Sequence, residues 1–179
     1  GVQTCALRSQ NTWYVPDDFP TIQAGIDGSS NGDTVIVRDG TYVENINFNG
    51  KAITLQSENG PSATIIDGNQ NGSVVTFDNG EGSNSVFEGF TVTNGFATDG
   101  GGMYCYFSSP TLTNCTFTGN TGGGMYCEWY SSPTLDNCTF TGNTDGGMSC
   151  VDYSSPTLEN CAFTDNADSK GGGMRCSSS

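Results

Sequence analysis

The 179-residue sequence contains no histidine, and its five lysines and arginines are outnumbered by 19 aspartates and glutamates. Histidine is the side chain that proteins use most often as a general base and as a metal ligand, so its absence removes the usual machinery for both roles. The formal net charge of -14 repels nucleic acid and anionic membrane surfaces. We therefore expect no nucleic-acid partner.

Long apolar runs are missing as well. No stretch approaches the roughly 20 apolar residues that a membrane-spanning helix needs, so we expect no membrane insertion by this segment. The first residue is Gly1 rather than methionine, which suits a processed mature chain or an expressed fragment. These features predict an extracellular or cell-surface location.

What the sequence has instead is one phrase written three times in its second half. Each copy reads Gly-Gly-Met-x-Cys, then Ser-Ser-Pro-Thr-Leu-x-Asn-Cys-x-Phe-Thr, and then Asn. The second cysteine of the phrase, at Cys115, Cys138 and Cys161, recurs every 23 residues. A fixed period of this length is typical of a repeat architecture.

Within each copy, apolar residues alternate with small polar ones, as at Met103 and Cys105 or at Cys115 and Phe117. This period of two indicates β-strand, and prolines and glycines at a fixed phase mark corners. A unit of about two dozen residues cannot bury its own apolar face and is stable only when stacked on like units. The sequence therefore predicts an all-β fold, a parallel β-helix (β-solenoid) of about six coils.

Stacked coils lie about 4.8 Å apart, so each repeated residue should form a ladder along the axis. Eight cysteines permit disulfides, but stacked thiols point the same way, which strains a bond between neighbours. We therefore interpret most of them as buried thiols. The predicted ladders are Cys105, Cys127, Cys150 and Cys176; Cys115, Cys138 and Cys161; Leu112, Leu135 and Leu158; Phe117, Phe140 and Phe163; and, at a turn, Asn120, Asn143 and Asn166.

Upstream of these copies the repeat is degenerate. We predict a single solenoid domain with degenerate coils over residues 34–100 and regular repeats over residues 101–179. Residues 1–33 are predicted to form an N-terminal cap. Its short amphipathic helix, Pro20–Asp27, would cover the open core of the first coil and block edge pairing.

The C-terminal end of the sequence opens a further copy of the phrase without completing it. Either the sequence is a piece of a longer array, or the next coil comes from another molecule. Cys5 belongs to no ladder and lies near the end opposite Cys176. Contact between Cys5 and Cys176 of successive molecules would join them head to tail into fibres.

The chain resembles right-handed parallel β-helix repeat proteins of the pectate-lyase-like superfold over nearly its whole length. Its repeats are also similar to those of polymorphic outer-membrane proteins, which pair Gly-Gly-aliphatic with Phe-x-x-Asn. Gly102-Met103 and the segment from Phe117 to Asn120 occupy these places in the first copy. The resemblance implies a right-handed solenoid with a secreted or surface role, often an adhesive one.

The same superfold includes polysaccharide lyases, hydrolases and esterases. For lyases the resemblance implies a basic residue beside carboxylate-bound calcium, and for hydrolases it implies paired aspartates. The repeats contain neither pattern, and the pair Asp17-Asp18 precedes the predicted helix, where acids favour the helix N-terminus. We therefore predict no catalytic residue and a protein that is not an enzyme.

Calcium is the one cofactor that the sequence suggests. Asp67, Asn69, Asn71 and Asp78 offer oxygen ligands at a spacing that resembles an EF-hand loop. They lie between predicted strands rather than helices, however, and Asn-Gly turns account for the same residue pattern. Both interpretations stay open.

An aromatic residue recurs at the corner after the first cysteine of each copy, as Phe107, then Trp129 and Tyr130, then Tyr153. Exposed aromatic side chains hold sugar rings or a protein partner, or else they cover the corner itself. We predict a noncatalytic extracellular or cell-surface solenoid with a structural or adhesive role, whose partner is a second copy end to end or a surface glycan or protein. The alternatives are a carbohydrate-binding module that uses the aromatic corners and a non-catalytic fragment of a polysaccharide-active enzyme.

Overall fold

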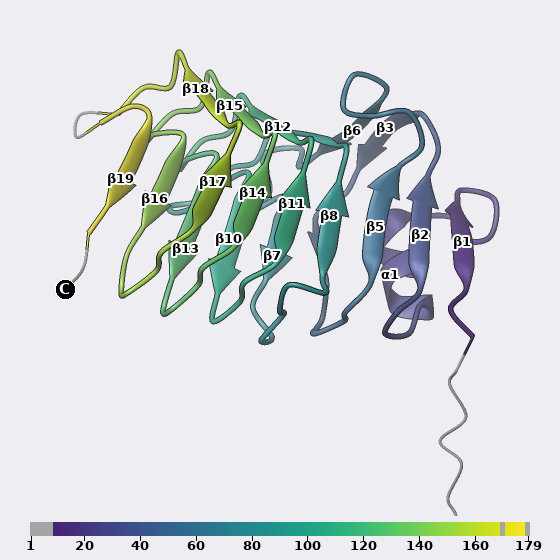
Figure 1. The fold of residues 1–179 in the computed structure, drawn as a ribbon. Coiled ribbons are helices and arrows are strands. Elements are labelled where there is room, and N and C mark those ends of the chain that lie inside the picture. Colours follow the sequence, from purple (N-terminus) through teal and green to yellow (C-terminus); the bar gives the residue numbers. More distant parts are fainter. Residues whose placement is uncertain (1–8, 169–170, 178–179) are drawn as a thin grey trace, which may run out of the picture.

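The computed structural model describes residues 9–168 and 171–177, and it confirms the predicted all-β fold. Short strands wind around a common axis and stack into a parallel β-solenoid, which runs from β1 to β19 along the molecule in Figure 1. The short helix α1 lies beside the first strands. The fold is therefore a stack of coils with three walls.

Three parallel sheets form these walls. Sheet A contains β1 (Thr12–Val15), β2 (Thr34–Val37), β5 (Thr54–Ser57), β8 (Val86–Glu88), β11 (Thr111–Thr113), β14 (Thr134–Asp136) and β17 (Thr157–Glu159). Sheet B contains β3 (Gly40–Val43), β6 (Thr64–Asp67), β9 (Thr91–Thr93), β12 (Thr116–Thr118), β15 (Thr139–Thr141) and β18 (Ala162–Thr164). Sheet C contains β4 (Ile46–Asn47), β7 (Val75–Phe77), β10 (Met103–Tyr106), β13 (Met125–Glu128), β16 (Met148–Cys150) and β19 (Met174–Cys176). Threonine and valine, which suit a pleated and half-buried surface, dominate these strands.

Neighbouring coils pair in register, so equivalent residues of the repeat stack on one another. In sheet B, Phe117 pairs with Phe140 and Phe140 with Phe163. Their ring centroids lie 4.8 and 4.9 Å apart, with planes inclined by 6° and 5°. Leu112 and Leu135 pair in the same way in sheet A, and both are fully buried. The sequence repeat thus produces the predicted ladders of identical side chains along the core. Each such ladder of stacked equivalent residues is here called a file.

Buried asparagine amides tie the coils together at one corner. Asn143 is fully buried, and its Nδ2 donates to the carbonyl oxygen of Phe117 and to Oδ1 of Asn166, both at 2.9 Å. Its Oδ1 accepts from the backbone N–H and from Nδ2 of Asn120, at 3.1 and 3.0 Å. Because the whole hydrogen-bonding capacity of this amide is used, its burial is compensated.

The N-terminal end departs from the predicted boundaries in two ways. β1 lies inside the segment predicted as a cap, residues 1–33, yet it pairs with β2 as a rung of sheet A. Sheet A consequently has seven strands, one more than the six coils expected. The helix α1 (Ile22–Gly28) starts two residues later than predicted, because the hydroxyl of Thr21 accepts from the N–H of Ala24 at 3.1 Å and caps it there.

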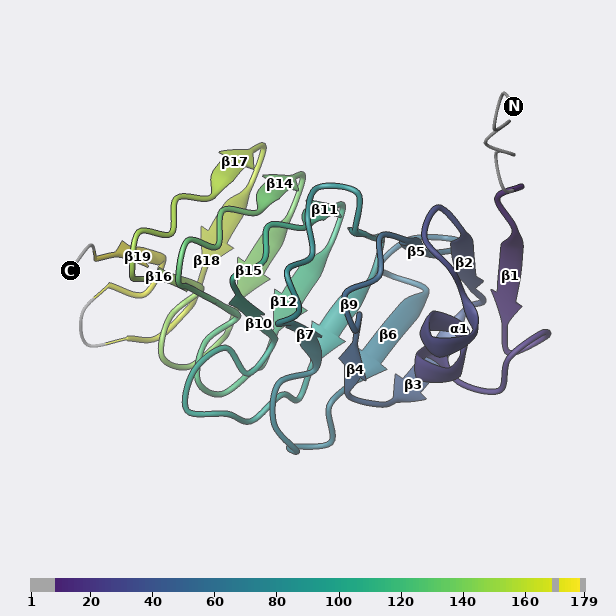
Figure 2. The same ribbon diagram turned by 90° about the horizontal axis from the view of Figure 1, so that it is seen from below.

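The helix α1 packs against β1, β2 and β4 and lies over the core at this end of the solenoid (Figure 2), with Ile22 and Ile26 buried. Glu44 accepts from two backbone N–H groups at its N-terminal end, both at 3.0 Å. Lys51 donates to three carbonyl oxygens at its C-terminal end, at 2.6–2.8 Å. These charges match the helix dipole. Within the described ranges, no helix has the length and apolar character needed to cross a membrane.

The substitution Asn143→Ala is expected to destabilise the solenoid by roughly 2–4 kcal/mol, because it leaves two buried backbone partners, on Asn120 and Phe117, without a hydrogen bond. Urea unfolding followed by circular dichroism measures this loss. Thr141→Ala, on the outer face of β15 in the same coil, is the matched control and should cost less than about 0.5 kcal/mol. Equal losses of unfolding free energy in the two variants would contradict the stabilising role of the buried asparagine amides.

Candidate functional site

Aromatic side chains gather on the outer face of sheet C and at the corner that follows it. The outer-face members are Tyr104, Tyr106 and Tyr126. The four residues at the corner between sheets C and A, here called the aromatic corner, are Phe107, Trp129, Tyr130 and Tyr153. Residues of the aromatic corner keep between 46% and 58% of their surface exposed. The structure thus brings together all four aromatic residues that the sequence singled out.

The rings of the aromatic corner stack along the solenoid axis. The centroids of Phe107 and Trp129 are 6.0 Å apart with planes inclined by 22°, and those of Tyr130 and Tyr153 are 5.2 Å apart at 11°. Carbon atoms in contact lie about 3.5–4.0 Å apart, so near-parallel rings at these separations must be offset sideways. Part of each ring face therefore stays uncovered.

The backbone of the aromatic corner is strained. All four of its residues lie in the left-handed region, with φ values of 50°, 53°, 59° and 63°. Each non-glycine residue there costs roughly 1–2 kcal/mol, and bulky residues are rare in this conformation. Glycine would fit without that cost, so the backbone does not explain the aromatic identity. Strain of this kind concentrates at functional sites.

Buried serines beneath the rings satisfy the backbone of this corner. Ser108, Ser131 and Ser154 form a file in which the N–H of Ser108 donates to Oγ of Ser131 and the N–H of Ser131 donates to Oγ of Ser154, both at 3.1 Å. The corner is therefore held together without the aromatic side chains. Of the two interpretations left open by the sequence, this favours a binding role over a cover for the corner.

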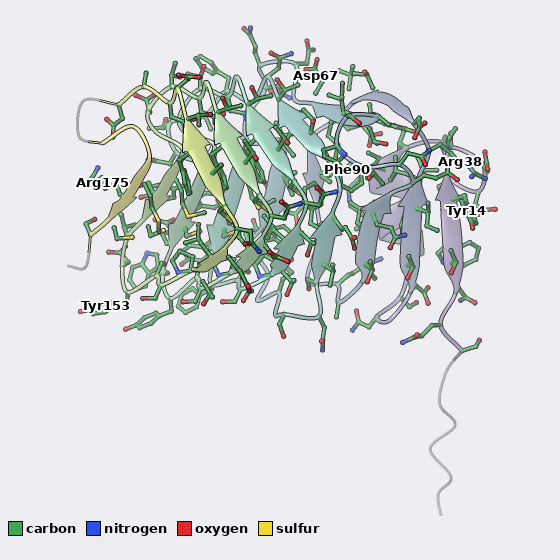
Figure 3. The ribbon with its side chains drawn as sticks, turned by 45° about the horizontal axis from the view of Figure 1, so that its top comes forward. Tyr14, Arg38, Asp67, Phe90, Tyr153 and Arg175 are labelled. Atoms are coloured by element: carbon green, nitrogen blue, oxygen red, sulfur yellow. The ribbon has the colours of Figure 1, made fainter. Side chains whose placement is uncertain are left out.

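A groove of about 340 Å³ lies on the outer face of sheet C, the sheet that leads into the aromatic corner. Residues paired in register on β13, β16 and β19 form its floor, namely Tyr126, Ser149 and Arg175. Three aspartates from corner segments between sheets B and C line its wall, namely Asp99, Asp145 and Asp168. Figure 3 shows Arg175 at the same end of the solenoid as Tyr153 of the aromatic corner. The groove therefore combines carboxylates, a guanidinium group and a phenol on the sheet that leads into the aromatic corner.

Two tyrosines of sheet C, Tyr104 and Tyr126, have a pKa above the ordinary value. Burial raises the pKa of Tyr104, and the hydrogen bond that its hydroxyl donates to the carboxylate of Glu128 raises it further. Burial also raises the pKa of Tyr126, followed by the negative charge of Asp99, while Arg175 acts in the opposite direction. Tyr104 stacks on Tyr126 with centroids 6.2 Å apart and planes inclined by 7°. The hydroxyl of Tyr104 already donates to Glu128, so its oxygen lone pairs are what it can offer to a further hydrogen bond.

The residues suggested for calcium do not form one ligand set. Asp67 ends β6 in sheet B, where its carboxylate accepts from the N–H of Asn69 at 2.8 Å and from Nδ2 of Asn94 at 2.9 Å. Asp78 follows β7 in sheet C and accepts from Nδ2 of Asn47 at 3.0 Å. The Asn-Gly turns of this segment thus account for the residue pattern that resembled a calcium-binding loop. Over residues 9–168 and 171–177, no cluster of three or more histidine, cysteine, aspartate or glutamate residues is arranged to hold a metal ion.

The cysteines of the described chain are free thiols. Cys105, Cys127 and Cys150 are buried and paired in register in sheet C, whereas Cys176, at the end of the same file, is exposed. Hydrogen bonding to Cys127 and burial raise the pKa of the Cys150 thiol. Cys5 lies outside the described residues, so its contact with Cys176 of a second molecule stays a prediction.

The groove of sheet C was not predicted from the sequence. Tyr104, Tyr126 and Arg175 each follow the methionine of a copy, and the period of two that turns the methionine inward turns them outward. The outward position of these three residues could therefore be predicted from the sequence. The aspartate wall of the groove could not, because these aspartates come from corner segments of unequal length, whose course the repeat does not specify.

Comparison with known proteins agrees with this architecture. The sequence model of the family described as "Right handed beta helix region" matches residues 64–179. The fold is similar to that of a pectin methylesterase solved in complex with hexasaccharide VII, with a TM-score of 0.56 and 12% identity over 91% of this chain and 68% of that chain. A mutant pectin methylesterase in complex with hexasaccharide IV gives a TM-score of 0.49 and 13% identity over 94% of this chain and 67% of that chain. No curated protein matches the sequence.

The likeness to the first of these structures contradicts the prediction that the protein is not an enzyme, because that protein, which has the same fold, is a methylesterase. At 12% identity the likeness is one of fold. The prediction was wrong because it rested on the repeats, which contain no acid–base pattern, and on Asp17-Asp18, the one adjacent acid pair. A site on a solenoid is assembled from residues of different coils and need not repeat.

Iodoacetamide should alkylate Cys176 of the native protein at least about tenfold faster than Cys105, Cys127 or Cys150, because Cys176 is exposed to the reagent and the other three thiols are buried. Mass spectrometry of cysteine-containing peptides after a timed reaction measures the rates. Labelling in urea is the control and should remove the difference. Equal labelling of all four residues in the native protein would contradict the buried cysteine file.

Proposed function

This chain belongs to the right-handed β-helix family, as its repeats predicted, and we propose that it binds an extended polysaccharide along the aromatic corner and the outer face of sheet C. A fold likeness to a pectin methylesterase that holds a hexasaccharide supports a polysaccharide-related role. The proposal includes a site of action outside the cell, as the composition of the sequence also predicts.

The observation that carries this proposal is the offset stack of exposed rings in the aromatic corner. Phe107 and Tyr153 belong to coils two steps apart, so the rings extend over about 10 Å along the axis. The apolar faces of successive sugar units pack well on such flat, half-exposed surfaces. A linear ligand is favoured because the rings form a row rather than a closed pocket.

The outer face of sheet C adds hydrogen-bonding groups beside this row. The hydroxyls of Tyr104, Tyr126 and Ser149 belong to one file of outward-facing residues, paired in register across β10, β13 and β16. Sugar hydroxyls both donate and accept hydrogen bonds, as these side chains do. A chain that stacks on the aromatic corner can therefore be oriented by sheet C.

Trp129→Gly should lower the affinity for polysaccharide by at least about tenfold, because an exposed aromatic at the centre of a binding surface is a typical energetic hot spot. The fold should be retained, since glycine adopts the φ of 53° at this position without strain. Affinity electrophoresis through gels that contain xyloglucan, galactomannan, mixed-linkage β-glucan or methylesterified pectin measures the retardation.

The matched control is Phe96→Ala, which removes an aromatic residue of similar exposure, 56%, that lies outside the aromatic corner. This variant should be retarded as strongly as the unmodified protein. If no polysaccharide of the panel retards the unmodified protein, or if Trp129→Gly and Tyr130→Gly both bind as well as it does, the proposed function is wrong.

Cleavage of an ester or glycosidic bond in the groove of sheet C is a second candidate function. Asp99 and Asp145 supply carboxylates suited to acid and base roles, and Arg175 supplies a positive group that can stabilise an oxyanion. All three line the groove. The fold likeness to a methylesterase favours testing for this activity.

Asp145→Asn is expected to lower any such activity by at least about 100-fold, the typical contribution of one acid or base. Asparagine tolerates the φ of 66° at this position. Released methanol and new reducing ends are measured with methylesterified pectin as substrate. Asp165→Asn, at a φ of 55° on a corner outside the groove, is the control and should keep full activity. A rate no higher than that of buffer would exclude this second function for the substrate used.

A further inference from the structure

The charges around this site identify the class of ligand, an inference that rests on the proposed function. We propose that the site selects uncharged polysaccharide chains and rejects polyuronates, in which the sugar units carry carboxylates. The arrangement of cations, of carboxylates and of the aromatic row each bears on this choice.

Cations are almost entirely committed elsewhere in the described chain. Arg38 is paired with Asp17 at 2.8 Å and with Glu58, and its guanidinium lies 4.5 Å from the ring centroid of Tyr14. Figure 3 shows Arg38 and Tyr14 at the end of the solenoid opposite Tyr153. This arginine therefore cannot neutralise a ligand held at the aromatic corner.

The remaining described cations are Lys51 and Arg175. Lys51 donates to three carbonyl oxygens at the C-terminal end of α1, so it belongs to the helix cap. Among the lysines and arginines of residues 9–168 and 171–177, Arg175 alone lines the groove of sheet C. Arginine in a bidentate contact is a favoured protein partner of a carboxylate, and the groove offers one arginine to a chain that carries a carboxylate on every sugar unit.

Carboxylates, by contrast, converge on the same surface. Asp99 lines the groove, Glu128 accepts from the hydroxyl of Tyr104, and Asp152 directly precedes Tyr153 of the aromatic corner. The negative charges of all three carboxylates act on the same phenol, that of Tyr126. Burial and then the charges of Asp99, Glu128 and Asp152 raise the pKa of Tyr126, against the smaller opposing effect of Arg175.

The net result is a negative field over a surface whose contacts are aromatic rings and hydroxyls. A uronate chain would bring further negative charges within the Debye length of about 10 Å at 0.1 M salt, so the repulsion is felt at the site. The net charge of -14 adds a long-range barrier to association. Neutral sugar units meet the same rings without this opposition.

The effect of ligand charge can be separated from that of ligand shape by comparing a charged and an uncharged form of the same oligosaccharide. Isothermal titration is carried out with hexagalacturonide as the full methyl ester and as the free acid, in EDTA so that divalent cations cannot bridge carboxylates. At about 0.02 M salt we expect the ester to bind at least about tenfold more tightly than the acid, and at about 0.5 M salt the gap should narrow through screening.

A double variant tests whether the named carboxylates are responsible. Glu128→Gln with Asp152→Asn removes two charges, keeps an acceptor for the hydroxyl of Tyr104 and suits the φ of 48° at position 152. This variant should narrow the ratio of affinities by about threefold or more at low salt. The control, Glu159→Gln with Asp165→Asn, removes two charges outside the groove and the corner and should change the ratio less.

Equal or tighter binding of the free acid overturns the inference while leaving the proposed function intact. Absence of binding by both forms also overturns it, and the panel of neutral polysaccharides then decides whether the proposed function fails as well. The ester could also bind more tightly than the acid by a factor that changes neither with salt nor in the double variant. The preference would then come from the shape of the ligand, and the electrostatic inference would be wrong.

Discussion

In-register pairing between neighbouring coils is the constraint on which the rest of this structure depends. Because each strand pairs residue for residue with the strand one coil away, an inward side chain of the regular repeats stacks on a copy of itself. Phenylalanine rings satisfy this requirement at separations of 4.8–4.9 Å, and asparagine amides satisfy it by donating to one coil and accepting from another. Like charges opposite one another are destabilising, which accounts for a core built from aromatic, aliphatic, thiol and amide files.

Outward positions are released from this requirement, and the site is built from them. The inward position that opens each copy is methionine four times, at Met103, Met125, Met148 and Met174. The next position, which faces outward, changes from tyrosine to tyrosine to serine to arginine along the same file. One strand pattern thus combines a uniform interior with a surface that differs from coil to coil. Chemical variety along the axis is what a linear ligand can distinguish.

The fold and the inner files could be predicted from the sequence because period and alternation specify them. The outer boundaries could not, since β1 contains no part of the repeated phrase and is recognised through its pairing with β2. Of the site, the aromatic corner was visible as recurring exposed rings. The groove of sheet C was not, because Asp99, Asp145 and Asp168 meet Arg175 through corner segments that differ between coils.

The strain at the aromatic corner shows how the solenoid separates folding from binding. Four left-handed residues would cost an isolated loop several kcal/mol at roughly 1–2 kcal/mol each. Here the corner is fixed on both sides by paired strands of sheets C and A, and from below by the serine file. The backbone therefore keeps its conformation whichever side chains it carries. In the proposed binding mode, rigid rings held in this way would lose little conformational entropy when a ligand packs on them, so weak contacts with individual sugar units would add up along the row.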